Sequence, residues 1–463
     1  MLASSRPWQL RRIDGSHCAF GLASCLLFGG GTSAGLPSDA LLQLCTIPLL
    51  VLSLFNMTVR PSNRFPLAFC ATIVLLPLLQ LIPLPPEVWS SLPGHAPVAE
   101  TFALMAQPLP WLPVSVAPQS TMLTALALIP PLAIFLSTLQ LPYQARSQLS
   151  VLILGFGVIS AFIGLIQVAQ GEGSSLRFYA VTNPTEAVGF FANRNHFAAL
   201  LYCLTLFAAA WASHFMTTMT MKGPRRDEHA VVKALFSLII LIVFVAVQAT
   251  ARSCAGLGLT VVALLGGVAL ALATRRRGTS RTPIILLVGT ITIAVLMTVQ
   301  LSFYRVFERF NFDPLTDARV FFARNTIAAA KTYMPLGSGL GTFGPVYQMF
   351  ETPADLMPYA FANRAHNDIL ESWLETGIFG LLLMAVFGVW FVMAAIRVWR
   401  PVQDRVRGIN QALAQAGSLV IVLLIAHSAV DYPLRTSGLL ALFAFACALL
   451  IPPPGDDESH HNT

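Results

Sequence analysis

Long apolar runs, each close to the length that crosses a bilayer, recur along this chain. The runs 234–249 and 283–299 approach the roughly 20 residues that a helix needs to cross a hydrocarbon core of about 30 Å. Of the 463 residues, 56% are hydrophobic and 11% are charged, whereas a typical soluble domain has about 25% charged residues. Such a chain has too little polar surface for a soluble globule, so lipid is its expected solvent.

Lipid offers no hydrogen-bond partners, so each spanning segment must satisfy its own backbone amides. The apolar runs lack the alternating pattern of a transmembrane barrel. The sequence therefore predicts an all-α polytopic membrane protein of about 12 transmembrane helices, forming a single membrane domain over residues 1–463. The expected spans are 17–33, 40–58, 66–84, 120–140, 148–169, 190–213, 233–250, 254–274, 283–303, 377–396, 411–430 and 436–451.

The distribution of basic residues predicts the orientation of these spans. Arg and Lys concentrate in alternate loops, as in 222–233, 275–281 and 397–407, whereas 85–119 contains none. Because cytoplasmic loops carry the excess of positive charge, both termini are expected in the cytoplasm. The segment 85–119 then becomes a first extracytoplasmic loop, and 304–376 becomes a large one between the ninth and tenth spans. The net charge of +7 reflects this topology, and no nucleic-acid partner is expected.

A second group of basic residues lies on the predicted outer side of the membrane, where an excess of positive charge is not expected. Solvent exposure and pairing with nearby carboxylates explain many single members. As a set they favour an anion, because guanidinium groups bind phosphate oxygens through paired donors and remain charged when partly desolvated. The members are Arg177, Arg194, Arg252, Arg305, Arg309, Arg319, Arg324, Lys331, Arg364 and Arg435.

Two positions stand out for possible chemistry. Arg252 lies in a very short connection between two apolar spans, where an ionisable residue indicates either function or snorkelling to the headgroups. His366 opens the segment 365–380, which enters the tenth span, and helical spacing would put it on one face with Leu370, Trp373 and Gly377. A neutral imidazole there is suited to take a proton from a sugar hydroxyl near pH 7, although a helix cap is the simpler interpretation.

The same segment resembles the H-[NSQ]-x9-G-x-x-[GTY] pattern of the O-antigen ligase and O-antigen polymerase family, with His366, Asn367, Gly377 and Gly380 at its fixed positions. The stretch 317–343 is similar to that family's Arg-containing helix and its P-x-G-x-G-x-G-x-F turn. The segments FFANRNHFA (190–198) and HSAVDYPLR (427–435) are similar to others in one branch of it.

This resemblance implies a glycosyltransferase of the bacterial inner membrane. Its donor would be a glycan on undecaprenyl pyrophosphate at the periplasmic face, and its acceptor a hydroxyl of the lipid A core or of another glycan unit. Neither a metal nor another cofactor is expected. The family's functional His maps onto His366, its mid-chain arginine onto Arg252, and its loop arginine onto either Arg319 or Arg324. Ligation and polymerisation share these motifs, so both remain open.

Weaker candidates surround these positions. Asn193, Arg194 and His196 are suited to hold sugar hydroxyls or to cap a helix. Asn367 lies close enough in sequence to orient His366 or to bind hydroxyls. His427 and Asp431, four apart on one helical face, are expected to form a pair that closes the bundle, and Arg435 follows them. The Gly-rich 337–341 is expected to be a tight turn rather than a nucleotide loop, because no strand precedes it.

Two rival functions remain. A small-solute transporter of the bicarbonate type would place its ionisable groups near the middle of the membrane, whereas here they gather outside. A non-catalytic subunit of a polysaccharide assembly complex would tolerate substitution of Arg252 and His366.

Overall fold

A computed structural model describes most of the chain. The described residues are 13–33, 35–219, 228–274, 314–353, 355–356, 361–400 and 408–454, with a few isolated positions between 285 and 296. Side chains are described from residue 318 onward in the segment that begins at 314. The predicted ninth span, 283–303, and Arg305 and Arg309 fall outside these ranges.

The described part of the chain is helical, with one isolated bridge between Leu84 and Leu112 and no strand. Within the described ranges, eight helical segments are long and apolar enough to cross a membrane, and three shorter apolar helices accompany them. These confirm the predicted all-α polytopic membrane protein. The bundle helices are α1 (Gly15–Phe28), α2 (Pro37–Phe55), α3 (Arg64–Gln80), α6 (Pro118–Leu126), α7 (Ile129–Gln140), α8 (Tyr143–Gln170), α9 (Arg194–Met219), α10 (Ala230–Gln248), α11 (Cys254–Thr274), α15 (Asp368–Trp399), α16 (Ile409–Ser428) and α17 (Ser437–Leu449).

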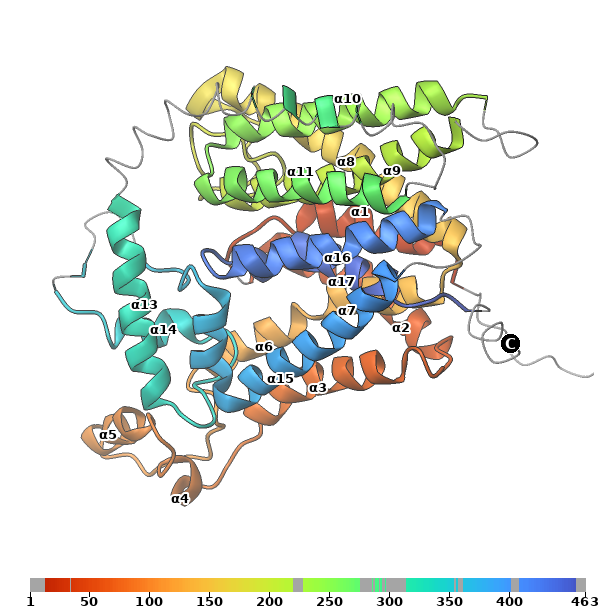
Figure 1. Cartoon of the computed structure of the whole chain (residues 1–463). Coiled ribbons are helices and arrows are strands. Elements are labelled where there is room, and N and C mark those ends of the chain that lie inside the picture. Colours follow the sequence, from red (N-terminus) through yellow and green to blue (C-terminus); the bar gives the residue numbers. More distant parts are fainter. Residues whose placement is uncertain are drawn as a thin grey trace, which may run out of the picture.

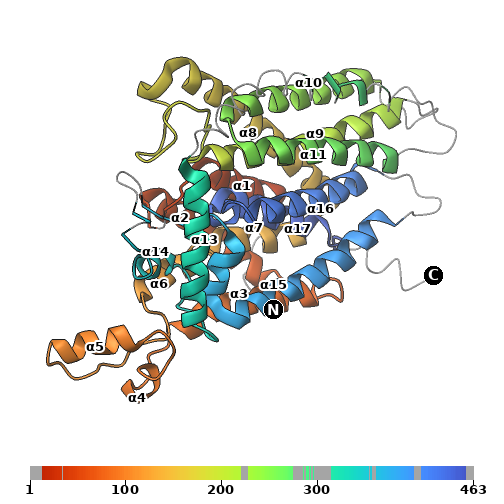
Figure 2. The same cartoon turned by 60° about the vertical axis from the view of Figure 1, so that its left-hand side comes forward.

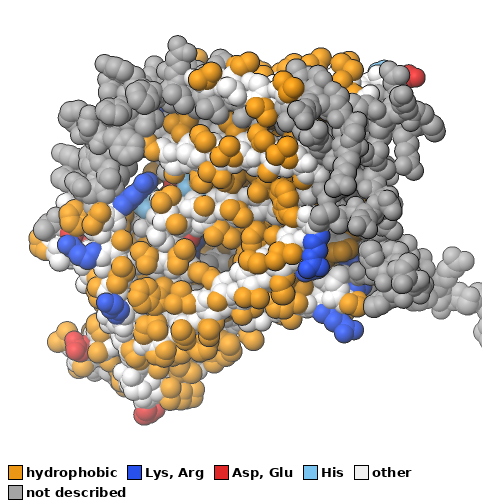
Figure 3. Space-filling model, viewed as in Figure 1, with side chains coloured by type: hydrophobic (Ala, Val, Ile, Leu, Met, Phe, Trp, Pro, Cys, Tyr) orange, Lys and Arg blue, Asp and Glu red, His pale blue; other side chains and the backbone are white. Residues whose placement is uncertain are grey.

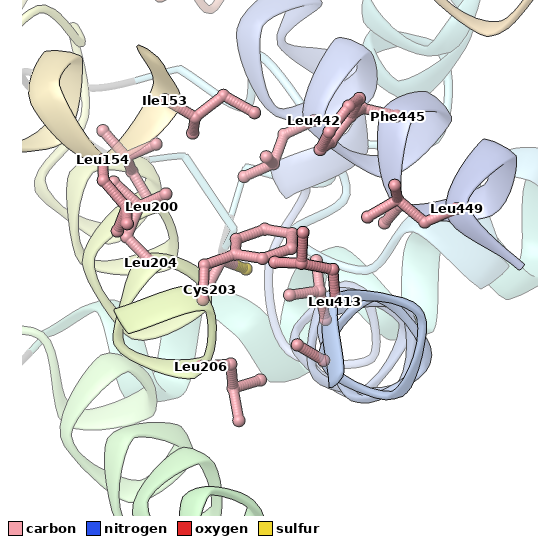
Figure 4. Packing of buried hydrophobic residues seen from close by; sticks show 14 of the residues in the cluster. Ile153, Leu154, Leu200, Cys203, Leu204, Leu206, Leu413, Leu442, Phe445 and Leu449 are labelled. Carbon is pink, nitrogen blue, oxygen red and sulfur yellow. The ribbon is translucent and has the colours of Figure 1, made fainter. Parts of the chain in front are cut away.

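Helix α9 forms the centre of the bundle. In the most apolar stretch of α9, 83% of the residues are buried, compared with 17% in that of α15. Helix α15 therefore runs along the periphery, with its side chains toward lipid. Leu200 and Leu204 of α9 pack with Leu154 of α8, Leu413 of α16 and Phe445 of α17 (Figure 4). Small side chains such as Ala208 and Ala209 occupy other buried positions on α9, which lets neighbouring helices approach closely.

One end of the bundle is fixed by a buried arginine. Arg146, at the start of α8, is 2% exposed and donates to the carbonyls of Leu139, Leu141, Ala448 and Ile451. These carbonyls lie at the C-terminal ends of α7 and α17, where no helical donor remains for them. The guanidinium therefore holds two helix ends together at this edge of the membrane domain.

The opposite end carries a cap built from the two long predicted loops. The cap contains α4 (Pro86–Trp89), α5 (Ala96–Leu104), α13 (Pro314–Thr332) and α14 (Phe343–Gln348) (Figures 1 and 2). It has its own small apolar core, which includes Phe322, Tyr333, Phe343 and Tyr347. Trp89 is buried and donates to the Pro110 carbonyl, so it packs inside the cap, whereas Trp111 is 63% exposed.

The glycines of the family motif join this cap to α15. Gly377 has φ +57 and interrupts the helix, which lets the Ile378 amide donate to the Pro335 carbonyl. Gly337, Gly339 and Gly341 also have positive φ, and the amides of Ser338 and Gly339 donate to the carbonyls of Leu374 and Glu375. The segment 337–341 thus forms the expected tight turn, packed against the break in α15.

We expect Gly377→Ala to destabilise the protein. An added Cβ would lie 2.0 Å from the Pro335 carbonyl oxygen, in a backbone conformation that L-residues rarely adopt. Strain of this kind costs about 1–3 kcal/mol, and the steric overlap adds to it. Gly388→Ala on the same helix is the control, since its Cβ would meet nothing within 4 Å and Ala favours helix. Thermal unfolding in nanodiscs compares the two, and an equal Tm would contradict the argument.

Candidate active site

His366 occupies a strained position immediately before α15. Its φ is +50, and helix α15 begins at Asp368 after an Asn367 cap whose side chain accepts from the amides of Ile369 and Leu370. The expectation that His366 lies on the helical face with Leu370 was therefore wrong, because the helix begins only after this residue. Asn367 also donates to the Ala429 carbonyl at 2.8 Å. Non-glycine residues with such backbone strain cluster at functional sites.

The His366 ring is held on three sides. Its Nδ1 lies 3.0 Å from Asp431 Oδ1, the ring of Phe322 stacks on it at 5.8 Å, and the ring of Tyr432 meets it edge-on at 4.9 Å. Its side chain is 17% exposed. An ionised carboxylate only accepts hydrogen bonds, so Nδ1 donates to Asp431, and in the neutral imidazole Nε2 carries the lone pair. In that neutral form the imidazole is oriented to act as a base.

Asp431 is the centre of this cluster. Its side chain is fully buried, its Oδ2 accepts from Asn195 Nδ2, and His427 Nε2 lies 4.0 Å away. Burial opposes ionisation, yet the hydrogen bond from His366 and the nearby histidines hold the pKa of Asp431 below its usual value. The expected contact between His427 and Asp431 exists, but the shorter contact of Asp431 is with His366.

Tyr432 joins the start of α9 to this cluster. Its hydroxyl accepts from the amide groups of Asn193 and Asn363, each at 3.4 Å, and its ring meets buried His196 edge-on at 4.9 Å. Burial raises the pKa of Tyr432 to about 12, so the hydroxyl stays neutral. Asn193 Oδ1 also accepts from the Asn195 amide, which agrees with the helix-cap interpretation of Asn193.

The two candidate loop arginines have different surroundings. Arg319 precedes Phe322 by about one turn of α13, so both project from the face of the helix that meets His366. Its Nε is buried without a hydrogen-bond partner among the described residues. Arg324 is 58% exposed, is paired with Asp355 at 2.7 Å and lies over the Phe321 ring. Arg319 thus lies on the side of α13 that faces the cluster, whereas Arg324 is engaged by Asp355.

Arg252 lies at the same end of the bundle. Its φ is +50, so it shares with His366 a backbone conformation that is strained for a residue other than glycine. It follows the short η2 turn (Ala249–Ala251) after α10. The Thr250 carbonyl in that turn accepts from the Ala187 amide, which joins it to the 171–193 loop. Glu186 of that loop is paired with Arg194 at the start of α9, and Arg177 donates to the carbonyls of Asn183 and Glu186.

Arg435 belongs to a buried charge network beside the site. Its guanidinium contacts Glu375 at 2.7 Å, Asp368 at 3.3 Å and Glu371 at 3.5 Å. Although burial disfavours its charge, these three carboxylates raise the pKa of Arg435. Arg364 also pairs with Glu371, at 2.8 Å. Breaking such a buried network costs several kcal/mol, so this geometry favours a supporting role for Arg435.

The tertiary structure therefore gathers His366, Asp431, His196 and Asn193 from three separate segments of the chain. Their shared partners Tyr432, Asn363 and Phe322 were missed by sequence reasoning, although Tyr432 lies within the quoted segment 427–435. The space-filling view shows histidine and basic side chains in a hollow beside α13, next to a surface that is otherwise hydrophobic (Figure 3). Among the described residues, no group of His, Cys, Asp and Glu is arranged to hold a metal ion.

These features define the class: a multi-pass α-helical membrane protein with an oriented histidine–carboxylate pair beneath a helical cap. Residues 236–385 match the family model described as O-antigen ligase. This match confirms the resemblance seen in the sequence and supports the O-antigen ligase family for the chain. It also supports a ligase reaction of the glycosyltransferase type and does not favour the transporter alternative. No curated protein matches the chain.

The matched region covers part of the site. It includes Arg252, Arg319, Arg324, His366 and Asn367. The remaining candidates, Asn193, Arg194, His196, Asp431 and Arg435, lie outside it, and the contacts described above connect most of them to the matched residues.

Proposed function

We propose that this protein transfers a glycan from undecaprenyl pyrophosphate to a hydroxyl of an acceptor sugar, in O-antigen or exopolysaccharide ligation or polymerisation. The observation that carries the proposal is the geometry of His366, whose Nδ1 is engaged by buried Asp431 at 3.0 Å. A histidine oriented in this way is suited to general-base catalysis. The O-antigen ligase match supplies the class of reaction.

The proposed reaction is a single displacement. His366 Nε2 takes the proton from the acceptor hydroxyl as that oxygen attacks the anomeric carbon, and the bond from this carbon to the pyrophosphate oxygen breaks. Arg319 and Arg252 stabilise the charge that develops on the leaving pyrophosphate, so the mechanism requires no metal. Attack opposite the leaving group inverts the anomeric configuration.

The other candidates have supporting roles in this proposal. Asp431 holds the His366 ring in one tautomer, and Asn367 fixes the backbone beside it. Asn193 and His196 position Tyr432 against the imidazole. Arg194 and Arg435 hold the surrounding segments through Glu186 and the three carboxylates on α15. Arg324 stabilises the outer part of the cap through Asp355.

We propose that the cap faces the periplasm and that the protein resides in the bacterial inner membrane. Helices leading away from the cap reach sequence segments rich in Arg and Lys, such as 222–233 and 397–407, which favours the cytoplasm for that side and for both termini. The loops 85–119 and 304–376 are then periplasmic. Lipid-linked glycan, an acceptor glycan or lipid A core, and a polysaccharide assembly complex are its proposed partners.

The central experiment is chemical analysis of glycans from a deletion strain. Accumulation of single lipid-linked units would indicate a polymerase, and accumulation of long lipid-linked chains would indicate a ligase. An unchanged surface polysaccharide together with an altered solute flux would refute the proposal and favour a transporter.

Arg319→Ala is expected to reduce transfer much more than Arg324→Ala. A hydrogen bond to a charged group contributes about 1.5–3 kcal/mol, so removing Arg319 should lower kcat/KM by roughly tenfold to a hundredfold. Arg324→Ala is the matched control on the same helix, because Arg324 is exposed and bound to Asp355. Initial rates in nanodiscs with lipid-linked donor compare the two. A larger loss for Arg324→Ala would assign the pyrophosphate contact to that residue instead.

A further inference from the structure

A side chain from the first turn of α15 holds the backbone that leads into His366. Glu371 is fully buried and folds back toward the chain that enters the helix. Its Oε2 accepts a hydrogen bond from the Ala365 amide at 2.9 Å. In a capping box, a first-turn glutamate reaches back to the amide of the cap residue itself. Here it reaches two residues beyond the Asn367 cap, so His366 lies between two anchored positions.

The two oxygens of the Glu371 carboxylate have different partners. Oε1 faces the guanidinium groups of Arg364 at 2.8 Å and Arg435 at 3.5 Å, whereas Oε2 faces the backbone amide. A buried carboxylate needs such cations, because its charge has left water and must be balanced within the protein. The two arginines therefore fix the direction of the side chain, and through it the place of the Ala365 amide.

These two anchors explain why His366 keeps its positive φ. Such a conformation is strained for a residue other than glycine and persists only when its surroundings impose it. Asn367 fixes the chain after His366. Before it, Ala365 is 2% exposed, so its amide needs a partner inside the protein. Without Glu371 the chain at Ala365 would shift toward another acceptor, which frees His366 to relax and carries Nδ1 away from Asp431.

We propose that Glu371 is a positioning residue for the general base. It acts through the backbone before His366, whereas Asp431 acts on the imidazole itself. The inference rests on the proposed function, because the general base belongs to that reaction. The buried charge network on α15 then serves catalysis as well as stability.

Glu371→Asp tests the reach of this side chain. The variant keeps the charge opposite Arg364 and Arg435 but shortens the side chain by one C–C bond, about 1.5 Å. This takes the carboxylate out of hydrogen-bond range of the Ala365 amide. A displacement of about 1 Å in a reacting geometry costs about 10²-fold in rate, so kcat should fall about tenfold to a hundredfold. The KM for lipid-linked donor should change little, because the proposed pyrophosphate ligands are untouched.

Glu375→Asp is the matched control, with the same shortening in the same charge network. Glu375 contacts Arg435 at 2.7 Å and accepts from the Phe343 amide at 3.3 Å, and neither contact involves the backbone beside His366. Its shortening should lower the Tm at least as much as Glu371→Asp does, while kcat is retained. Equal losses of kcat in the two variants would assign Glu371 to stability alone and overturn the proposal.

A double variant separates positioning from general weakening. Asp431→Asn disturbs the other contact that orients the imidazole. If Glu371 and Asp431 both act on His366, their effects on kcat are not additive. Asp431→Asn should then lower kcat much less in a Glu371→Asp background than in the wild-type protein. The same fold loss in both backgrounds would contradict the proposal.

A spectroscopic measurement tests the geometry without any turnover. The full-length protein, with its histidine rings labelled with ¹⁵N, is examined by NMR in nanodiscs, and His366→Gln assigns the Nδ1 proton signal of His366. This signal should be the same in wild type and Glu375→Asp, and shifted or lost in Glu371→Asp. An unchanged signal in Glu371→Asp would overturn the proposal.

A backbone substitution tests the same contact if Glu371→Asp does not fold. Replacing Ala365 with its α-hydroxy acid analogue removes the amide hydrogen that Glu371 accepts and leaves every charged side chain in place. The kcat and the His366 signal should then change as expected for Glu371→Asp, and no change in either would overturn the proposal.

The two proposals fail in different ways. If the wild-type protein transfers glycan from no lipid-linked donor, the proposed function fails, and the NMR signal still decides whether Glu371 positions His366. If the wild-type protein transfers glycan and loss of the Ala365 contact changes neither kcat nor the signal, the function stands and the role of Glu371 is overturned.

Discussion

Replacing His366 with Ala is expected to abolish glycan transfer while the protein still inserts and folds. A positioned general base contributes about 10²–10⁴-fold to a reaction rate, and the described surroundings of His366 offer no second residue with the same contacts. The loss should appear in kcat, because the imidazole acts on the proton that moves in the transition state. Transfer from lipid-linked donor in nanodiscs, with thermal unfolding measured on the same samples, checks both parts.

The control for this variant is His17→Ala. His17 lies on α1 and pairs with Asp14, outside the cluster around Asp431, so activity should be unchanged. A near-normal yield of glycan product from His366→Ala would remove this residue from the mechanism. Loss of folded protein would instead assign it to stability, and His366→Gln, which retains polar atoms, would then separate the two roles.

Asp431→Asn is the second change with a large expected effect, a fall of about 10²–10³-fold in kcat with little change in KM. The Asn195 amide already donates to Oδ2 of Asp431, so the new asparagine must turn its carbonyl oxygen toward Asn195. Its NH2 group then faces His366 Nδ1 and donates to it. This places the imidazole proton on Nε2, where it blocks acceptance of a proton from the acceptor hydroxyl.

This argument predicts a partial rescue. In the double variant Asp431→Asn, Asn195→Ala, the competing donor is gone, so the new amide can turn its oxygen toward His366 and restore the productive tautomer. The double variant should therefore be more active than Asp431→Asn alone, although Asn195→Ala by itself gives no gain. Equal or lower activity of the double variant would show that Asp431 acts through its charge or through packing rather than through the tautomer.

Much of the fold could be predicted from local pattern. Eleven of the expected spans coincide with helices in the described ranges, because an apolar run in lipid has to satisfy its own backbone hydrogen bonds. Local pattern misled at His366, where periodicity suggested a helical face. The Asn367 side chain caps the start of α15, just after His366. A cap depends on the hydrogen bonds of one side chain, whereas periodicity is a pattern over many residues and does not locate the first residue of a helix.

The two loop arginines also show what sequence leaves open and tertiary structure decides. Sequence offset alone left Arg319 and Arg324 equivalent. Their environments differ because Arg319 shares a face of α13 with Phe322, which stacks on His366, whereas Arg324 finds a carboxylate in Asp355. The direction of a side chain on a cap helix depends on what that helix packs against, which is a tertiary property.

The sequence by itself determined that this chain is a helical membrane protein and that His366 and Asn367 stand at fixed positions of the family's motif, because apolar length and motif spacing are local properties. Only the tertiary structure decided that Asp431 orients His366 and that Tyr432 and His196 complete the cluster. These partners lie far apart along the chain, and contacts between them arise from helix packing around α9 and from the cap resting on α15. The physical reason is that a hydrogen bond depends on distances and directions in space, which spacing along one chain does not fix.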